Sequence, residues 1–484
     1  MSERSTSQER RRPTSASERT TSLERRSATS ASEPTDSLER RSTTGTSEGR
    51  VRVHRRTFLG SLGVVGGGSL AGCLGVLGSR IDDADNGRIV DWNERFVDAV
   101  QRYQEGNVAP VRRAAFLNVS MFDAVNAITG ARGDPHYTPY RIEIDAAPPE
   151  ASRPAAAIGA AFEVVTRFYH REFFEDVLQA SLDDASDGEG DVAEGIEWGR
   201  TVATRLLEER QYDEVFTTEP YQACQNPANA PGCFRGNWIP EFAFVPPWTM
   251  HSREQFRPQG PPALDSQAYA DDWHEVYEIG ADTDDRPQRQ VDQAAFWRGT
   301  AGSPRVPSMW NLVAQGFVRE ANRSILENAR TFALLSLALA DAGTSCWEAK
   351  YEYGFWRPRT AIREADRDGN PDTVVDPDWE PLSVGSSPEY SAGLATYGGA
   401  ASRILVEEFD DDTPFSFGST ITTGLDGDAF GVSRSFDNLS HALEDSWMSR
   451  LYLGNHFRFA LEDGARAGDE LGSYIYDTVL RPVD

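Results

Sequence analysis

The chain has 484 residues, with 48 basic against 76 acidic residues and a formal net charge of −28. Its 39% hydrophobic and 10% aromatic content excludes a wholly disordered chain, and its length suffices for one large or two ordinary domains. The acidic surplus argues against nucleic acid as a partner, because phosphate would be repelled. One basic residue, Lys350, is a lysine and the others are arginine, a composition typical of proteins from very salty environments.

The first 53 residues differ in composition from the rest and are predicted to be disordered. They consist mainly of Ser, Thr, Arg and Glu, and the string Ser-x-Glu-Arg-Arg recurs every 15 residues, at Ser7, Ser22 and Ser37. Such a segment has too few apolar side chains to form a core. An alternative interpretation is that translation starts later, near Val51 or Val53, from a non-ATG codon.

Residues 54–79 are predicted to be an export signal. The pair Arg55-Arg56 is followed by Thr-Phe-Leu and a moderately apolar stretch, which resembles a twin-arginine signal. Several glycines interrupt the stretch, so it suits a permanent membrane span poorly. It ends in Leu-Ala-Gly-Cys73, which resembles a lipobox. We therefore expect export by the twin-arginine route and a lipid anchor on the outer face of the cell membrane; an unmodified loop cysteine is the alternative.

Export would place the other cysteines in an oxidising setting. Cys224 and Cys233 lie in a loop rich in Pro, Asn and Gly, where a local disulfide and two unpaired thiols are both open interpretations. Cys346 stands beside Trp347 in a helical pattern and is expected to be a packed apolar residue. The cysteine spacing contains no zinc motif.

Residues 80–484 are predicted to form one all-α domain. Apolar residues recur at helical spacing in residues 109–128 and 323–349. Extended alternating segments are scarce, and residues 212–266, rich in Pro, Gly and aromatics, are expected to form a long loop region. We predict a helical bundle, which could consist of two packed four-helix sub-bundles. Further helices are expected near 388–408, 437–452 and 457–476.

Three segments in the last third of the chain contain residues that could hold an oxyanion. In the first, Lys350 and Arg357 are seven residues apart, which predicts two turns of one helix face, and Pro358 should end or kink that helix. The second segment is Ser-Pro-Glu-Tyr-Ser-Ala-Gly-Leu, residues 387–394. In the third, Arg450 and His456 are six residues apart with a glycine between them, so a bend could bring both to one site.

Lys350 is informative because a surface position would have been satisfied by arginine. A compact ammonium is not interchangeable with a planar guanidinium in a tight oxyanion pocket. The neighbouring aromatic residues Trp347, Tyr351 and Trp356 indicate burial. Taken alone, each segment also has a simpler interpretation, namely surface cations whose stems pack on apolar neighbours, or a hydrogen-bonded core histidine.

The combination and order of the three segments resemble the vanadium-dependent haloperoxidases and the related type 2 phosphatidic acid phosphatases. The motifs of that family are Lys, six residues, Arg-Pro; Pro-Ser-Gly-His; and Ser-Arg, five residues, His. The resemblance runs from about Asn86 to Asp477. It includes Asn-Val-Ser-Met-Phe-Asp-Ala-Val-Asn at 118–126, Gln-Phe-Arg-Pro at 255–258 and Phe-Trp-Arg-Pro-Arg-Thr-Ala-Ile-Arg at 355–363.

The resemblance implies the helical haloperoxidase fold, with a vanadate or phosphate site within 340–476 and no nucleotide cofactor. Lys350, Arg357, Arg450 and the backbone N–H of Gly393 would contact the oxygens of the anion. His456 would bind vanadium axially or, in a phosphatase, attack phosphorus. Peroxide and halide would be the substrates of a haloperoxidase.

The sequence departs from the family at three positions. Ala392 replaces the serine of the second motif, and Leu394 replaces its acid–base histidine, which removes a group worth about 10²–10⁴-fold in rate. Ala460 stands four residues after His456, where the family usually has an aspartate that fixes the histidine tautomer. Asp463 is near but wrongly spaced, and a one-residue slip that recruits Ser391 would also displace the glycine.

Two hypotheses therefore remain open on the sequence alone. One is an exported haloperoxidase-like enzyme, or a weak acid phosphatase, that uses another acid. The other is a non-catalytic oxyanion-binding or scaffold lipoprotein that keeps the family fold. The cations of the site are present, whereas the proton-handling residues are missing.

The acidic stretch over residues 366–372 faintly resembles a calcium loop. It lacks the third early ligand and the glutamate at the end of a twelve-residue loop. We predict a plain acidic turn there.

Overall fold

The computed structural model describes residues 87–143, 146–185, 190–211, 229–236, 239–422 and 429–483. The low-complexity segment, the twin arginine and Cys73 therefore lie outside the described residues. The described chain is mainly helical, as predicted. Its helices are α1 (Arg88–Arg102), α2 (Ala109–Ala131), α3 (Arg153–Phe168), α4 (Glu175–Ala185), α5 (Val192–Glu209), α6 (Gln267–Ile279), α7 (Gln288–Phe296), α8 (Val306–Glu320), α9 (Ile325–Tyr353), α10 (Pro358–Arg363), α11 (Gly393–Phe409), α12 (Leu439–Tyr452) and α13 (Arg458–Thr478).

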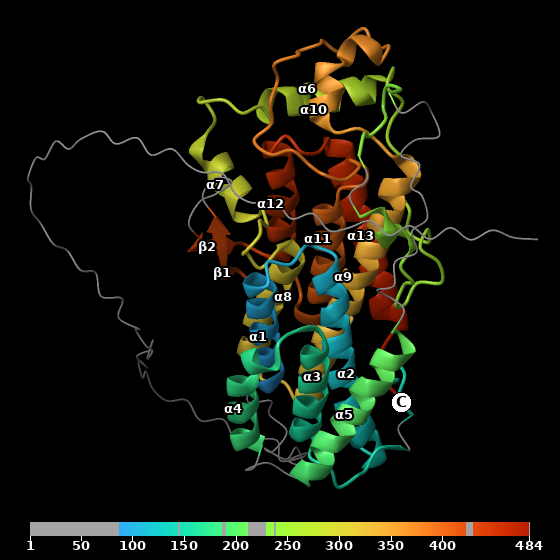
Figure 1. Ribbon diagram of the computed structural model, residues 1–484, viewed down its shortest axis with the longest axis vertical. Coiled ribbons are helices and arrows are strands. Elements are labelled where there is room, and N and C mark those ends of the chain that lie inside the picture. Colours follow the sequence, from blue (N-terminus) through green and yellow to red (C-terminus); the bar gives the residue numbers. More distant parts are fainter. Residues whose placement is uncertain are drawn as a thin grey trace, which may run out of the picture. The chain divides into compact units, whose positions relative to one another are not determined.

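Helix α9 is the longest helix and runs through the centre of the bundle (Figure 1). A capping box starts it, in which Ser324 and Glu327 each accept a hydrogen bond from the other's backbone N–H. Nearly all of its residues are buried, because α2 packs against one part of the helix and α11 and α13 pack against another. The helix is apolar on all sides, which explains its strong hydrophobic pattern in the sequence and is typical of a helix at the centre of a bundle.

Helices α11 and α13 both begin at the candidate site and pack closely along their length. A Cβ at Gly399 would lie 2.1 Å from the carbonyl oxygen of Ala465, and one at Gly468 would lie 2.1 Å from that of Thr396. Only glycine allows the two backbones to approach so closely. This packing brings the second and third sequence motifs together, and the N–H of Ala392 donates to the carbonyl of Ala460 at 3.1 Å.

A two-stranded antiparallel sheet, formed by β1 (Phe415–Thr422) and β2 (Ala429–Phe436), interrupts the helical pattern. The sequence analysis did not predict it. In β1, Phe415 and Phe417 stack on Phe436 of β2, and Phe417 also contacts Phe296 and Trp297. The hairpin therefore packs its aromatic face on α7, the helix that precedes the loop beside the candidate site (Figure 1).

The smaller sequence predictions have mixed outcomes. Cys346 is a free, buried cysteine, as predicted. Cys233 is disulfide-bonded, but Cys224 lies outside the described residues, so their pairing stays a prediction. Asp368 and Asn370 accept hydrogen bonds from nearby backbone N–H groups, which is the geometry of a plain turn. Within the described residues no group of three or more His, Cys, Asp or Glu side chains could hold a metal ion, and no helix is long and apolar enough to cross a membrane.

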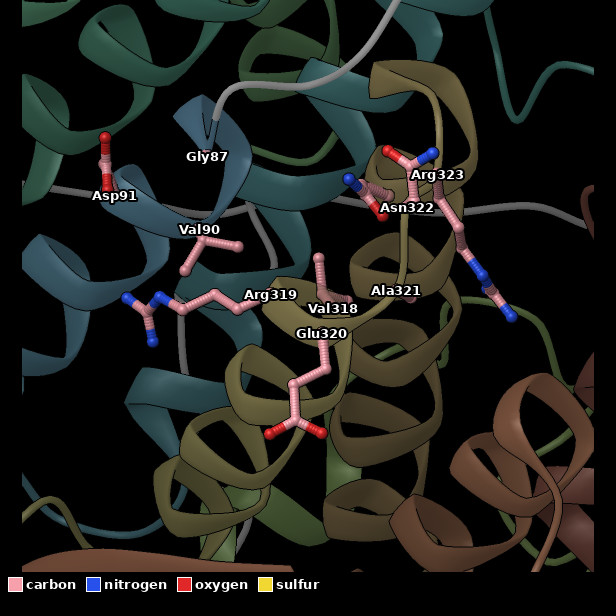
Figure 2. Close-up of a pocket in the computed structure, with 10 residues that line it drawn as sticks. Gly87, Val90, Asp91, Val318, Arg319, Glu320, Ala321, Asn322 and Arg323 are labelled. Carbon is pink, nitrogen blue, oxygen red and sulfur yellow. The ribbon is translucent and has the colours of Figure 1, made fainter. Parts of the chain in front are cut away.

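Figure 2 shows a cavity of about 530 Å³ between the start of α1 and the turn from α8 to α9. Charged side chains line it, among them Asp91, Arg319, Glu320 and Arg323. It lies at the beginning of α9, whereas the sequence-predicted site lies at the end of that helix. The cavity is therefore separate from the candidate site.

Candidate oxyanion site

The first motif spans the junction between α9 and α10. Lys350 lies in the last turn of α9, which ends at Gly354 in the left-handed conformation, with φ of 53°. Arg357 is the N-cap residue of α10, and Pro358 occupies the first turn of that helix. The prediction of a single helix face for Lys350 and Arg357 is therefore wrong. Gly354 ends the helix before Arg357, and Pro358 starts a new helix instead of kinking the old one.

Lys350 is buried, with 2% of its surface exposed. Its ammonium donates to the carbonyls of Pro388 at 2.6 Å and Glu389 at 3.1 Å, in the loop before α11. Burial lowers the pKa of Lys350 to about 7, assisted by repulsion from Arg357. The lone lysine of the chain is therefore buried beside the second motif, as its aromatic neighbours indicated.

Arg357 is also buried, and all five of its N–H groups have protein partners. Nε donates to the carbonyl of Ser387 at 2.8 Å, and Nη2 donates to the hydroxyl of Ser387 at 3.1 Å and the carbonyl of Pro388 at 3.2 Å. Nη1 donates to the carbonyl of Asn455 at 2.8 Å and to Nε2 of His456 at 2.9 Å. Arg357 thus joins all three motifs, and an anion that binds it must replace some of these bonds.

Arg450, at the end of α12, has no carboxylate partner among the described residues. Its Nη2 donates to the carbonyl of Trp297, and its Nε lies 3.2 Å from the hydroxyl of Ser449. Burial and the positive charges of Arg298 and Arg357 lower its pKa to about 9. Nη1 of Arg450 has no hydrogen-bond partner in the described part of the chain, so Arg450 retains free donors.

His456, in the turn between α12 and α13, is held from both sides of its ring. Nδ1 lies 3.0 Å from Oε1 of Glu389, and Nε2 accepts from Arg357. Burial, together with Arg357, Lys350 and Arg450, holds the pKa of His456 well below its usual range. The imidazole is therefore neutral, and all three cations lie within electrostatic reach of it.

Glu389 is a site residue that the sequence analysis missed. It is fully buried, and its Oε1 also accepts from the backbone N–H of Phe457 at 3.0 Å. Burial raises its pKa to about 8, although Arg357 and Lys350 act in the opposite direction. A glutamate inside an otherwise apolar Pro-Glu-Tyr segment was the available signal, since a buried acid requires partners.

The positions at which the sequence departs from the family motifs lie near the beginnings of α11 and α13. Ala392 is the N-cap of α11 and makes no side-chain cap, so the first-turn N–H groups, that of Gly393 included, have no capping side chain. Leu394 packs against the main hydrophobic core. Ala460 is buried in the apolar cluster around the site, and Asp463 accepts from Tyr390 at 2.6 Å. No hydrogen bond joins any of these four side chains to His456.

The residues of the site fit a tetrahedral oxyanion. Three cations that are at least nine-tenths buried converge, and Glu389 is the one carboxylate that hydrogen-bonds within their cluster among the described residues. Uncompensated buried positive charge is costly and favours the entry of an anion. Nε2 of His456 carries no proton, as binding of vanadium through this atom would require.

Comparisons with known proteins agree with this fold. Residues 330–484 match the family model described as the VCPO second helical-bundle domain. The vanadium chloroperoxidase of Curvularia inaequalis is 31% identical over 184 residues, which cover 30% of this chain and 29% of that protein. The chain thus spans less than a third of the length of this curated relative.

Solved structures extend the likeness to most of the chain. The first bacterial vanadium-dependent iodoperoxidase has a TM-score of 0.65 and 24% identity, covering 82% of this chain and 97% of that one. A bacterial vanadium-dependent chloroperoxidase in its holo form has a TM-score of 0.57 and 16% identity, covering 82% and 94%. At these identities the likeness establishes the fold.

The fold and the motif residues thus define an all-α protein of the haloperoxidase architecture. The sequence matches, over residues 330–484 and over 30% of the chain, support the vanadium haloperoxidase superfamily that the motif order predicted.

Proposed function

We propose that this protein binds vanadate or phosphate through Lys350, Arg357, Arg450 and His456. The observation that carries the proposal is the buried excess of positive charge, in which Arg450 has like-charged neighbours and no carboxylate partner among the described residues. The first-turn N–H groups of α11, beginning at Gly393, add further donors without a side-chain cap. Charge-assisted bonds to several converging donors are what a tetrahedral anion requires.

Bound vanadate would supply the peroxide-dependent halide oxidation for which the superfamily is named. The contribution of the chain is to hold the anion, to exclude water and to present a neutral imidazole at Nε2. Ala392 and Leu394 offer no hydroxyl and no titratable group, so proton transfer to a bound peroxide would depend on solvent or on another residue. This favours slow turnover, and the alternative is a protein that binds the anion without catalysis. The same imidazole would suit a weak acid phosphatase, with a nucleophilic His456 oriented by Glu389.

The thermal unfolding of the chain in the presence of vanadate or phosphate tests the binding proposal. A ligand at a hundredfold excess over its Kd stabilises the folded state by about 2.7 kcal/mol, so both anions should raise the Tm. Lys350→Met should abolish that rise, whereas Arg200→Met, at an exposed arginine far from the motifs in sequence, should not. An unchanged Tm in the wild type at millimolar anion would contradict the proposal.

We also propose export by the twin-arginine route and lipidation at Cys73. The sequence of residues 54–79 carries this proposal, and the disulfide at Cys233 supports it, because disulfides persist outside the reducing cytosol. Replacement of both Arg55 and Arg56 by lysine should retain the protein inside the cell. Cys73→Ser should release the exported protein from the membrane fraction, and an unaltered distribution in both variants would contradict the proposal.

A further inference from the structure

We propose that Glu389 is the positioning residue of the site, in place of the aspartate that is missing at Ala460. The inference rests on the proposed function, because the role of the positioned histidine is to help bind an anion. The hydrogen-bond geometry around the ring can still be tested without a ligand. Glu389 fixes the ring and the tautomer of His456, so that Nε2 carries no proton and acts as an acceptor. The second motif thus supplies this partner through a residue that lies 67 positions before His456.

The hydrogen bonds around the ring allow one tautomer. An arginine can only donate, so the contact from Nη1 of Arg357 makes Nε2 of His456 an acceptor. The proton of the neutral imidazole must then be on Nδ1, which faces Oε1 of Glu389 at 3.0 Å. The backbone N–H of Phe457 also donates to Oε1, so this oxygen is an acceptor whether or not the carboxyl carries a proton on Oε2.

This tautomer is the less favoured one for a histidine in water, where the neutral ring prefers its proton on Nε2. That ordinary preference would block coordination through Nε2. A hydrogen-bond acceptor held beside Nδ1 reverses this preference and keeps the proton on Nδ1. Groups that hydrogen-bond to metal-binding histidines usually have this function.

The backbone of Glu389 is fixed as firmly as its side chain. Its N–H donates to the carbonyl of Phe355 at 2.9 Å, and its carbonyl accepts from Lys350. The residue therefore joins the α9–α10 junction, the ammonium of Lys350 and the ring of His456. Such fixation suits a group that sets the orientation of another side chain.

A simpler interpretation is that Glu389 only caps α13, since Phe457 precedes that helix. Asp272 allows capping of α13 to be distinguished from positioning of His456. Its Oδ2 accepts from the N–H of Phe459 at 2.6 Å at the same helix end, and none of its hydrogen bonds involves His456. Asp272→Asn is therefore a control for a weakened helix end with an intact histidine contact.

The experiment is ¹⁵N NMR of the imidazole nitrogens in the ligand-free full chain labelled at histidine. The chain has seven histidines, and the spectrum of a His456→Gln variant identifies the signals of His456. We expect the Nδ1–H tautomer in the wild type, in Asp272→Asn and in Glu389→Gln, whose amide oxygen can still accept. Glu389→Ala should shift the ring towards the Nε2–H tautomer.

Vanadate titration then measures the consequence. Loss of a partner of this kind typically weakens metal affinity about 10–100-fold, and we expect that loss in Glu389→Ala but not in Glu389→Gln. An unchanged tautomer in Glu389→Ala would overturn the inference, as would an equal shift in Asp272→Asn. If Glu389→Ala does not fold, Glu389→Met, which also offers no acceptor to Nδ1, takes its place, and an unchanged tautomer in that variant would overturn the inference. Failure of the wild type to bind vanadate would contradict the proposed function and leave the tautomer result to decide this inference.

Discussion

Arg357 donates from Nη1 to Nε2 of His456 at 2.9 Å. The atom that would bind vanadium and one of the groups that would bind its oxygens are therefore hydrogen-bonded to each other. Binding of vanadium at Nε2 would have to break this hydrogen bond. The other four N–H groups of Arg357 also have partners within the chain. Arg450 retains free donors, so we expect Arg450→Met to abolish most of the rise in Tm that vanadate causes in the wild type.

Anion binding should weaken as Lys350 loses its proton. The pKa is 10.5 in an ordinary lysine and about 7 in the folded protein. Between these values the unfolded chain binds one proton more, so the ligand-free protein gains stability as the pH rises. The charged ammonium of Lys350, which anion binding requires, is lost as the pH rises through 7.

Sulfate is a suitable probe for this titration, because its two negative charges do not change across the neutral range. The rise in Tm caused by sulfate should shrink from about pH 6 to about pH 9 in the wild type. Lys350→Met removes the ammonium but leaves Glu389 and Arg450, and it also corrects for the general stabilising effect of sulfate on folded proteins. A sulfate effect with the same pH dependence in both proteins would contradict the assignment.

Restoration of the family residues of the second motif should raise catalysis. General acid–base groups contribute about 10²–10⁴-fold, so Ala392→Ser/Leu394→His should oxidise bromide at least 100-fold faster than the wild type with peroxide and vanadate. Ala392→Ser alone should mainly stabilise the protein, by about 1 kcal/mol, because it restores an N-cap to α11. A wild type as active as the double variant would show that the natural substitutions are harmless.

Gly385→Ala should disturb the site through Arg357. A Cβ there would lie 2.4 Å from Cζ of Arg357 and 2.7 Å from its Nη1. Overpacking of this kind costs about 1–3 kcal/mol, and the displaced guanidinium would release Nε2 of His456. We expect a lower Tm and a weaker vanadate effect. Gly316→Ala, in α8 with open space around the added Cβ, should leave the vanadate effect intact.

Stability should increase with potassium chloride, consistent with a protein adapted to salt. At a net charge of −28, repulsion among carboxylates outweighs the surface ion pairs, and the screening length falls from about 10 Å at 0.1 M to about 3 Å at 1 M salt. The Tm should therefore rise over this range and then level off. A Tm that falls steadily with added chloride would show that the ion pairs dominate instead.

The sequence predicted what depends on local pattern. The helices α2, α9, α12 and α13 lie close to their expected ranges, because apolar spacing along the chain determines the buried face. The end of α9 was misplaced, although Gly354 and Pro358 together are an ordinary signal for one helix ending and another beginning. The β1–β2 hairpin was missed even though Phe415 and Phe417 show the alternation of a strand.

The candidate site was predictable as a set of cations but not as a hydrogen-bond network. Motif order identified Lys350, Arg357, Arg450 and His456, and the structure brings them together. The contact between Glu389 and His456 spans 67 positions, and only the packing of α11 on α13 creates it. Spacing along the chain therefore pointed to Ala460 as a missing partner and could not find the glutamate beside the ring.

The length of α9 also sets the distance between the first described residue and the cations of the site. The described chain begins at Gly87, which lines the cavity in Figure 2 together with Asn328 in the first turn of α9. Lys350 lies in the last turn, about 33 Å further along the helix axis at 1.5 Å per residue. Gly87 therefore lies near one end of α9, and the cations of the site lie near the other. A group attached at Gly87 would therefore be held remote from the cations of the site.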